Sequence, residues 1–207
     1  MTETIQAERI TLYDLIDKFN FKLSENPAFF REWQDNLPEI NEREKQQLHR
    51  VKNNYFNLVM RPMVEDMVKM VVLSPLLDLA GFYLPPFYTT AESSIEIEEK
   101  DKELIIRGRI DVLVLQERFW VLVIESKRSG FSLEVGIPQC LAYMLGSPHA
   151  DKSLFGLVTN GSNFIFLKLV KGEQFEYALS DEFSLRRGDD LVTVLAILKG
   201  LKRGILS

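Results

Sequence analysis

The chain of 207 residues has very little of the chemistry used by secreted proteins and by nucleophilic hydrolases. Its single cysteine, Cys140, excludes an internal disulfide and is typical of a reducing, cytoplasmic setting. Only two histidines are present, His49 and His149, and neither lies in a recognisable catalytic context. A nucleophilic role for the cysteine therefore has no support, and apolar packing is its expected role.

Long apolar runs and an apolar signal region are also missing. The first residues include Glu3 and Glu8, so secretion is not expected. The longest apolar region, residues 67–84, is interrupted by charged residues and a proline, which predicts a core helix and no membrane span. A formal net charge of −5 argues against a general nucleic-acid coat, although a local basic groove remains compatible with it. The length suffices for one good core and does not demand two domains.

One stretch carries charges that its apolar context does not explain. Two apolar runs, residues 110–115 and 119–124, flank a short polar break at residues 116–118. This pattern predicts two buried strands joined by a tight hairpin. Asp111 interrupts the first strand, and Glu125 lies at the end of the second. Ionised groups on buried elements are costly unless they are paired or bind a metal ion.

Strand geometry predicts that these charges converge. If Leu115 pairs with Val121 across this hairpin, counting back sets Asp111 opposite Glu125. Cross-strand partners share a face, with Cβ atoms about 5 Å apart. Lys127 joins them because alternate positions of a strand share a face. Two interpretations follow: a structural ion-pair network, or two carboxylates that hold a divalent cation.

The rest of the chain predicts an α/β fold with a mixed central sheet of about five strands. The sheet contains an antiparallel meander and is flanked by helices. Helices are expected over residues 2–30, 42–60, 62–80, 133–145 and 189–201, and further strands over residues 89–99, 103–107, 154–159 and 164–170. Asn41 and Glu44 resemble a capping box at the start of the second helix. We expect residues 1–60 to form a helical extension packed on a single compact unit, residues 61–207.

Four short motifs together resemble the PD-(D/E)XK nuclease superfamily. They are Gly108-Arg-Ile-Asp111, Glu125-Ser-Lys127, Gln139-Cys-Leu-Ala-Tyr143 and Thr159-Asn-Gly161. The combination is similar, more narrowly, to the restriction-endonuclease-like domain at the N-terminus of the type I restriction motor subunit. The resemblance covers residues 61–170. Ile110 replaces the proline of the superfamily's name, and the chain has no Gly-x-x-x-x-Gly-Lys-Ser/Thr loop for an ATP-driven motor.

This resemblance implies a metal site and assigns its residues. Asp111, Glu125 and the main-chain carbonyl of Ser126 would ligate Mg²⁺, with Mn²⁺ as a substitute. Lys127 would orient or deprotonate the attacking water, or neutralise charge in the transition state. Glu65, on the preceding helix, would hold a second metal ion or an outer-shell water; taken alone it is a solvated surface acid.

The resemblance also implies substrate contacts. Gln139 would support the site and contact the nucleic-acid backbone beside Tyr143, although plain helix packing explains both residues as well. Asn160 is most simply part of a turn, with DNA contact as the second interpretation.

Four cations are candidates for a phosphate-binding rim: Arg107, Arg109, Arg128 and Lys168. For each of them taken singly, a scattered solvated cation is the simpler interpretation.

Two functions follow as expectations. The first is a Mg²⁺-dependent endonuclease that hydrolyses DNA, a member of a restriction system. The alternative is a catalytically silent, nuclease-like scaffold that binds nucleic acid or a restriction or repair partner. That partner would be a separate helicase or methyltransferase subunit. A homodimer built through residues 1–60 would suit double-strand cleavage, because each site cuts one strand.

Overall fold

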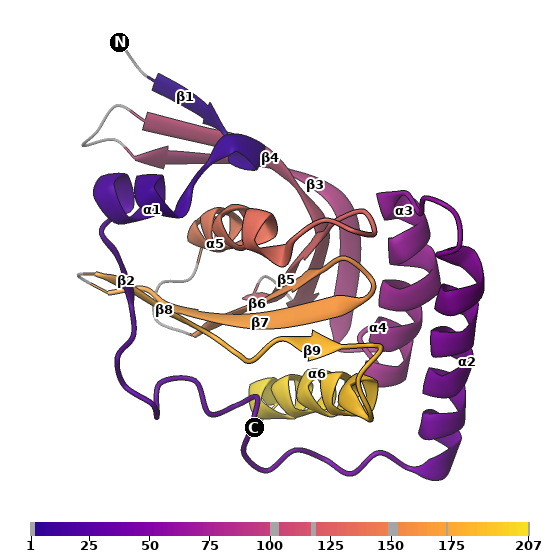
Figure 1. Ribbon diagram of the computed structural model, residues 1–207. Coiled ribbons are helices and arrows are strands. Elements are labelled where there is room, and N and C mark those ends of the chain that lie inside the picture. Colours follow the sequence, from indigo (N-terminus) through magenta and orange to yellow (C-terminus); the bar gives the residue numbers. More distant parts are fainter. Residues whose placement is uncertain (1–2, 100–103, 117–118, 149–152, 173, 207) are drawn as a thin grey trace.

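The computed structural model describes residues 3–99, 104–116, 119–148, 153–172 and 174–206. These residues form an α/β fold in which helices cover both faces of one mixed sheet (Figure 1). The strands are β1 (Glu3–Gln6), β2 (Phe21–Leu23), β3 (Phe87–Glu99), β4 (Leu104–Gln116), β5 (Phe119–Ser126), β6 (Leu154–Thr159), β7 (Asn163–Val170), β8 (Phe175–Leu179) and β9 (Phe183–Ser184). The helices are α1 (Leu12–Phe19), α2 (Glu42–Leu58), α3 (Glu65–Val68), α4 (Ser74–Ala80), α5 (Gly136–Leu145) and α6 (Asp190–Leu206).

The prediction of about five strands is wrong, because the described residues form a nine-stranded sheet. The central order is β1-β4-β5-β6-β7-β8-β2, with β3 on β4 and β9 on β7. The additional strands β1, β2, β8 and β9 have two to five residues each, too few for a readable period. Two of them, β1 and β2, lie in the N-terminal segment beside helices α1 and α2, so this segment is helical only in part. The boundary proposed at residue 60 stays a prediction.

Strand β4 shares one of its edges between two partners. Its first residues pair with β1 as far as Arg107, and its last residues pair with β5 from Val112 onward. Residues 108–111 lie in the gap between these two ladders. Strand β3 runs along the opposite edge of β4. The Gly-Arg-Ile-Asp motif is therefore the one part of β4 at which this edge is open.

The predicted hairpin exists, but it closes differently. Gln116 pairs with Phe119 and Leu115 with Trp120, and the intervening residues 117 and 118 lie outside the described residues. A β-bulge between Val114 and Leu115 then shifts the register by one residue. Beyond the bulge Val112 pairs with Ile124, the register that the predicted pairing of Leu115 with Val121 gives. The register beside the charged residues is therefore as predicted, although Leu115 itself pairs with Trp120.

The helical predictions are largely confirmed. Both hydrogen bonds of the Asn41 and Glu44 capping box are present, each of 3.0 Å. Residues 65–80 form one helical run in which α3 and α4 are joined by a π-helical turn, Lys69–Leu73. Such turns often occur at functional sites. Within the described ranges, no helix combines the length and apolar character that crossing a membrane requires.

The two faces of the sheet carry separate cores. One core lies beneath α2, α4 and α6, and the other beneath α1 and α5 (Figure 1). Helix α5 connects the parallel strands β5 and β6 and packs against both of them. The carboxyl ends of β5 and β6 are therefore adjacent, and Lys127 N donates to Thr159 O at 2.7 Å just beyond them.

A candidate active site at the ends of β4 and β5

Asp111 is held at the open edge of β4. Its carboxylate Oδ2 accepts a hydrogen bond of 2.6 Å from the backbone N–H of Ser126, at the end of β5. On the other side, Asp111 lies opposite Glu92 of β3, and neither residue belongs to the β3–β4 ladder. Glu92 has a φ of 55°, in the left-handed region. This local irregularity turns two acidic side chains toward the same space.

Glu125 is the more deeply buried of the two candidate metal ligands, with 2% of its surface exposed against 8% for Asp111. Its Oε1 accepts a 2.5 Å hydrogen bond from Lys127 Nζ. Its Oε2 is buried and has no hydrogen-bond partner among the described residues. An unpaired buried carboxylate oxygen is costly, so it indicates either a bound proton or a missing ligand.

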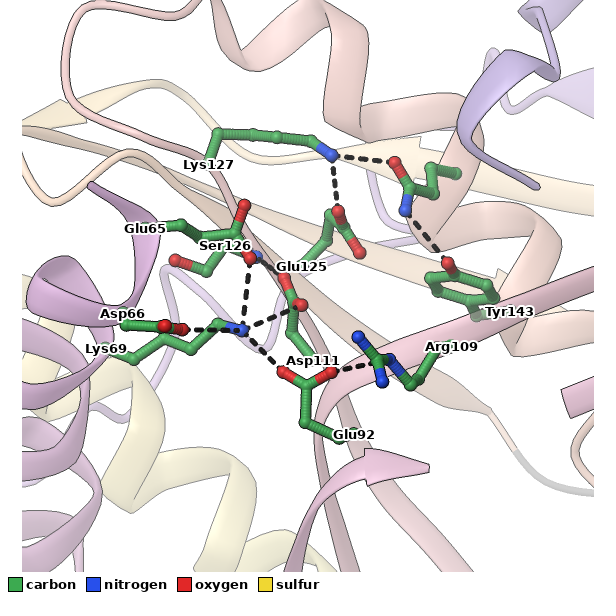
Figure 2. Close-up of polar contacts among 11 residues, drawn as sticks. Glu65, Asp66, Lys69, Glu92, Arg109, Asp111, Glu125, Ser126, Lys127 and Tyr143 are labelled. Atoms are coloured by element: carbon green, nitrogen blue, oxygen red, sulfur yellow. Dashed lines mark hydrogen bonds and ion pairs between the residues drawn. The ribbon is translucent and has the colours of Figure 1, made fainter. Parts of the chain in front are cut away.

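A chain of hydrogen bonds fixes Lys127. Its Nζ donates to Gln139 Oε1 at 2.7 Å, and Gln139 Nε2 donates to the Tyr143 hydroxyl at 2.8 Å (Figure 2). Tyr143 packs against β4 at Gly108, where a Cβ atom would lie 2.7 Å from Tyr143 Cε1. The absence of a side chain at Gly108 therefore leaves the space that the Tyr143 ring occupies. The predicted residues Asp111, Glu125, Lys127, Gln139 and Tyr143 are brought together.

Lys69, which the sequence analysis did not single out, occupies the centre of the acidic group. Its Nζ lies 3.0 Å from Asp111 Oδ1, 3.0 Å from Glu65 Oε1 and 2.9 Å from Glu92 Oε1 (Figure 2). The π-helical turn begins at Lys69. The only signal in the sequence was the i, i+4 spacing from Glu65, which is common on helix surfaces. Glu65 lies near Asp111, because both carboxylates contact the Lys69 ammonium; its role in the site stays a prediction.

The pKa values of the two buried carboxyls, Asp111 and Glu125, are both raised, and burial is the main cause in each. Burial, and then the charge of Asp111, raises the pKa of Glu125 to about 8, against the opposing effect of Lys127. Burial also raises the pKa of Asp111 to about 6, with the Ser126 N–H opposing and the charge of Glu65 contributing. Burial opposes the charge on Lys69, but hydrogen bonds to Glu92 and Asp111 outweigh it and raise its pKa. Both carboxyls therefore hold a proton more tightly than an exposed carboxyl does, even with Lys69 and Lys127 beside them.

The residues present fit a small, hard cation. The carboxylates of Asp111 and Glu125 are the oxygen donors that Mg²⁺ prefers. The Oε2 atom of Glu125 has no hydrogen-bond partner among the described residues, so its lone pairs are free to bind a cation. Against this, no group of three or more His, Cys, Asp or Glu side chains in the described part of the chain is arranged to hold a metal ion. A metal site here would depend on the main-chain oxygen of Ser126 and on withdrawal of Lys69 from Asp111.

The residues predicted to contact substrate differ in how far their side chains are already engaged within the protein. Arg109 is paired with Glu92 at 2.6 Å. Arg128 is exposed, and its guanidinium lies 4.1 Å from the Phe131 ring centroid. Asn160 uses both ends of its amide within the protein, donating to Phe131 O and accepting from two backbone N–H groups. This bonding explains Asn160 structurally, while its contact with substrate stays a prediction.

The other two candidate rim cations are neutralised within the protein. Arg107 pairs with Glu96 at 2.6 Å, and Lys168 pairs with Glu32 at 2.5 Å. Of the four candidate cations of the rim, only Arg128 has no carboxylate partner within the described ranges. No protein-family model and no curated protein matches this chain.

Proposed function

We propose that this protein is a metal-dependent endonuclease of the PD-(D/E)XK type, with the fold of the restriction-endonuclease-like domain of type I restriction motor subunits. The observation that carries the proposal is the meeting of Asp111, Glu125, Lys127 and Gln139 at one end of the β4–β5 hairpin. These are the residue types, in the order along the chain, that such nucleases use. Structural ion-pair networks also perturb buried groups, and Glu32, which pairs with Lys168, likewise has one buried carboxylate oxygen without a partner among the described residues. The proposal therefore rests on the meeting of the four residues and not on the orphaned oxygen of Glu125.

Asp111, Glu125 and the carbonyl of Ser126 would hold Mg²⁺, or Mn²⁺ in its place, with Glu65 beside them for a second ion or a water. When bound, the ion polarises the phosphate and lowers the pKa of a water molecule. Glu125 would then both bind the ion and accept a hydrogen bond from Lys127. Binding requires its ionised form, so the raised pKa of Glu125 makes the site sensitive to pH.

Lys127 is the residue that would orient the attacking water. Its ammonium is fixed by Glu125 and Gln139 at 2.5 and 2.7 Å, so it approaches the reacting group in one position. An ammonium in that position orients the water and stabilises the negative charge that grows on the phosphate in the transition state. Tyr143 acts through Gln139 as a positioning residue.

Nicking of supercoiled plasmid DNA with added Mg²⁺ tests the proposal. Wild-type protein is expected to nick, and Asp111→Asn and Lys127→Gln are each expected to lower the rate by about 100-fold or more. Asp17→Asn and Lys22→Gln are matched controls at exposed positions and should nick at the wild-type rate. Nicking that is indifferent to Asp111 and Lys127 would contradict the proposal.

A second candidate function rests on Lys69. Its ammonium contacts three carboxylates where a metal ion would lie, as expected of a silent scaffold that binds nucleic acid or a partner protein. Calorimetric titration with Mg²⁺ separates the two candidates. Binding in wild type that is lost in Asp111→Asn favours the nuclease, and no binding in either favours the scaffold. The partner subunit and the homodimer stay predictions.

A further inference from the structure

A polar cavity of about 480 Å³ lies beside the candidate active site. This volume is within the range of about 300–1,000 Å³ that is typical of small-molecule pockets. Its lining includes the side chains of Tyr55, Ser129, Phe131, Asn160, Glu182 and Arg186. None of these residues is among those that surround Asp111 and Glu125, so the cavity is a separate feature.

The main chain links this cavity to the catalytic lysine. Ser129 is two residues beyond Lys127, a reach of roughly 7 Å at most. Its backbone N–H donates to Met63 O, just before α3, and its hydroxyl lies 3.4 Å from the Tyr55 hydroxyl. The cavity therefore lies at the carboxyl ends of the parallel strands β5 and β6. In open α/β sheets this is where ligands bind.

The wall of the cavity is pre-formed. Asn160 Nδ2 donates to Phe131 O at 2.7 Å, and its Oδ1 accepts from the backbone N–H groups of Ser162 and Asn163 at 3.0 and 2.8 Å. These bonds tie the loop after β5 to the turn after β6. The main chain of Phe131, whose ring is exposed, is thus held in place, and a ligand would lose little free energy in ordering this loop.

Two arginines that stack on aromatic rings lie at or next to the cavity: Arg186 belongs to its lining, and Arg128 directly precedes the lining residue Ser129 along the chain. The Arg128 guanidinium lies 4.1 Å from the Phe131 centroid, and the Arg186 guanidinium lies 5.1 Å from the Phe56 centroid. Neither has a carboxylate partner among the described residues, in contrast to Arg109. Unneutralised cations interleaved with aromatic rings are typical of surfaces that follow a nucleic-acid strand.

The negative charge of Glu182 restricts which part of a nucleotide the cavity could accept. Its carboxylate, in the cavity lining, accepts a hydrogen bond from Asn163 Nδ2 and would repel a phosphate. An uncharged group with N–H donors suits it better. A nucleobase with an exocyclic amino group meets this requirement, since acidic side chains accept from such groups.

We propose that this cavity binds one unpaired nucleobase of the substrate strand, stacked on the face of Phe131 that Arg128 does not cover, while Arg128 and Arg186 bind the flanking phosphates. The base would be one with an exocyclic amino group, held by Glu182. The proposal rests on the proposed nuclease function for the identity of the ligand, and it assigns the chain a preference for single-stranded or distorted DNA. Extruding a base from an intact duplex costs unstacking free energy that an unpaired base does not require.

Binding of a fluorescein-labelled single-stranded DNA oligonucleotide, followed by anisotropy with EDTA present, tests this without strand cleavage. The salt dependence separates phosphate contacts from stacking. Arg128→Gln and Arg186→Gln should each lower the slope of log K against log salt by about 0.7. Phe131→Leu should weaken binding about five-fold or more and leave the slope unchanged. Arg43→Gln, an exposed arginine of α2, is the matched control and should behave as wild type.

Base preference and strand state give the remaining readouts. Wild type should bind oligo-dC more tightly than oligo-dT and should bind single strands more tightly than a blunt duplex, and Glu182→Ala should lose the preference for cytosine. Circular dichroism confirms that each variant is folded.

The outcomes separate this proposal from the nuclease proposal. Nicking by wild type with rim variants that bind as wild type would overturn the cavity assignment alone. Binding that depends on Phe131 and the two arginines, without any Mg²⁺-dependent nicking, would support the cavity and overturn the nuclease proposal. Absence of all nucleic-acid binding would overturn both.

Discussion

Glu125→Gln should flatten the pH dependence of stability in the metal-free protein. Burial and the Asp111 charge raise the pKa of Glu125 from 4.5 to about 8. The folded protein therefore binds this proton more tightly than the unfolded chain does. The associated stability is fully present below about pH 4.5 and is lost as the pH rises through about 8.

The magnitude follows from the size of the shift. Within this window the free energy of unfolding falls by about 1.4 kcal/mol for each pH unit. Between about pH 5.5 and 8, wild type should lose roughly 3 kcal/mol through Glu125 alone. Glutamine has the shape of the protonated carboxyl and does not titrate, so the variant should lack this loss. Its uncompensated amide at the Oε2 position adds an offset to the stability, but that offset does not vary with pH.

Urea denaturation at a series of pH values, with EDTA present, measures the effect. The informative quantity is the difference in slope between wild type and Glu125→Gln, since other groups titrate equally in both. Glu134→Gln, at an exposed position, controls for the loss of a carboxylate as such. Parallel slopes in wild type and Glu125→Gln would refute the idea that this carboxyl is protonated in the folded protein.

Three further substitutions probe the groups around the site. Lys69→Met leaves Asp111 buried without its cation, so thermal denaturation should show a loss of roughly 2–3 kcal/mol, and calorimetry should show tighter Mg²⁺ binding; unchanged affinity would exclude competition by the ammonium. Gly108→Ala places a Cβ 2.7 Å from Tyr143 Cε1, so urea denaturation should show a loss of about 1–3 kcal/mol together with slower nicking, and a wild-type stability would contradict the close approach. Tyr143→Phe removes the hydrogen bond that orients Gln139, so kcat for nicking should fall with KM little changed; an equal effect on both would indicate a structural role only.

The centre of the site could be predicted from the sequence because strand geometry is strictly periodic. The alternation of side chains along each strand sets Asp111 and Glu125 on the same face of the sheet, provided that the register between the two strands is right. Here the register was right at the charged end although Leu115 pairs with Trp120 and not with Val121, because the β-bulge between Val114 and Leu115 shifts the register by one residue. Gln139 and Tyr143 followed from helical spacing, and their contact is confirmed.

The parts that the sequence could not predict depend on irregular backbone. Lys69 reaches Asp111 from a π-helical turn, and Glu92 reaches the same space from a residue with positive φ within a strand. Neither conformation has a signature in these residue types. The short strands β1, β2, β8 and β9 were missed for another reason: they form only because neighbouring strands of the sheet offer free hydrogen-bonding groups.

The assignment of Asp111 and Glu125 as a metal site is tested most directly by titrating the protein with Mg²⁺ at pH 7 in buffers of different ionisation enthalpy. At this pH most Glu125 is protonated, and binding requires its carboxylate, so wild type should release about one proton for each ion bound. Glu125→Gln should show neither the binding nor the proton. Binding of Mg²⁺ without proton release, or binding that is equal in wild type and Glu125→Gln, would contradict the assignment.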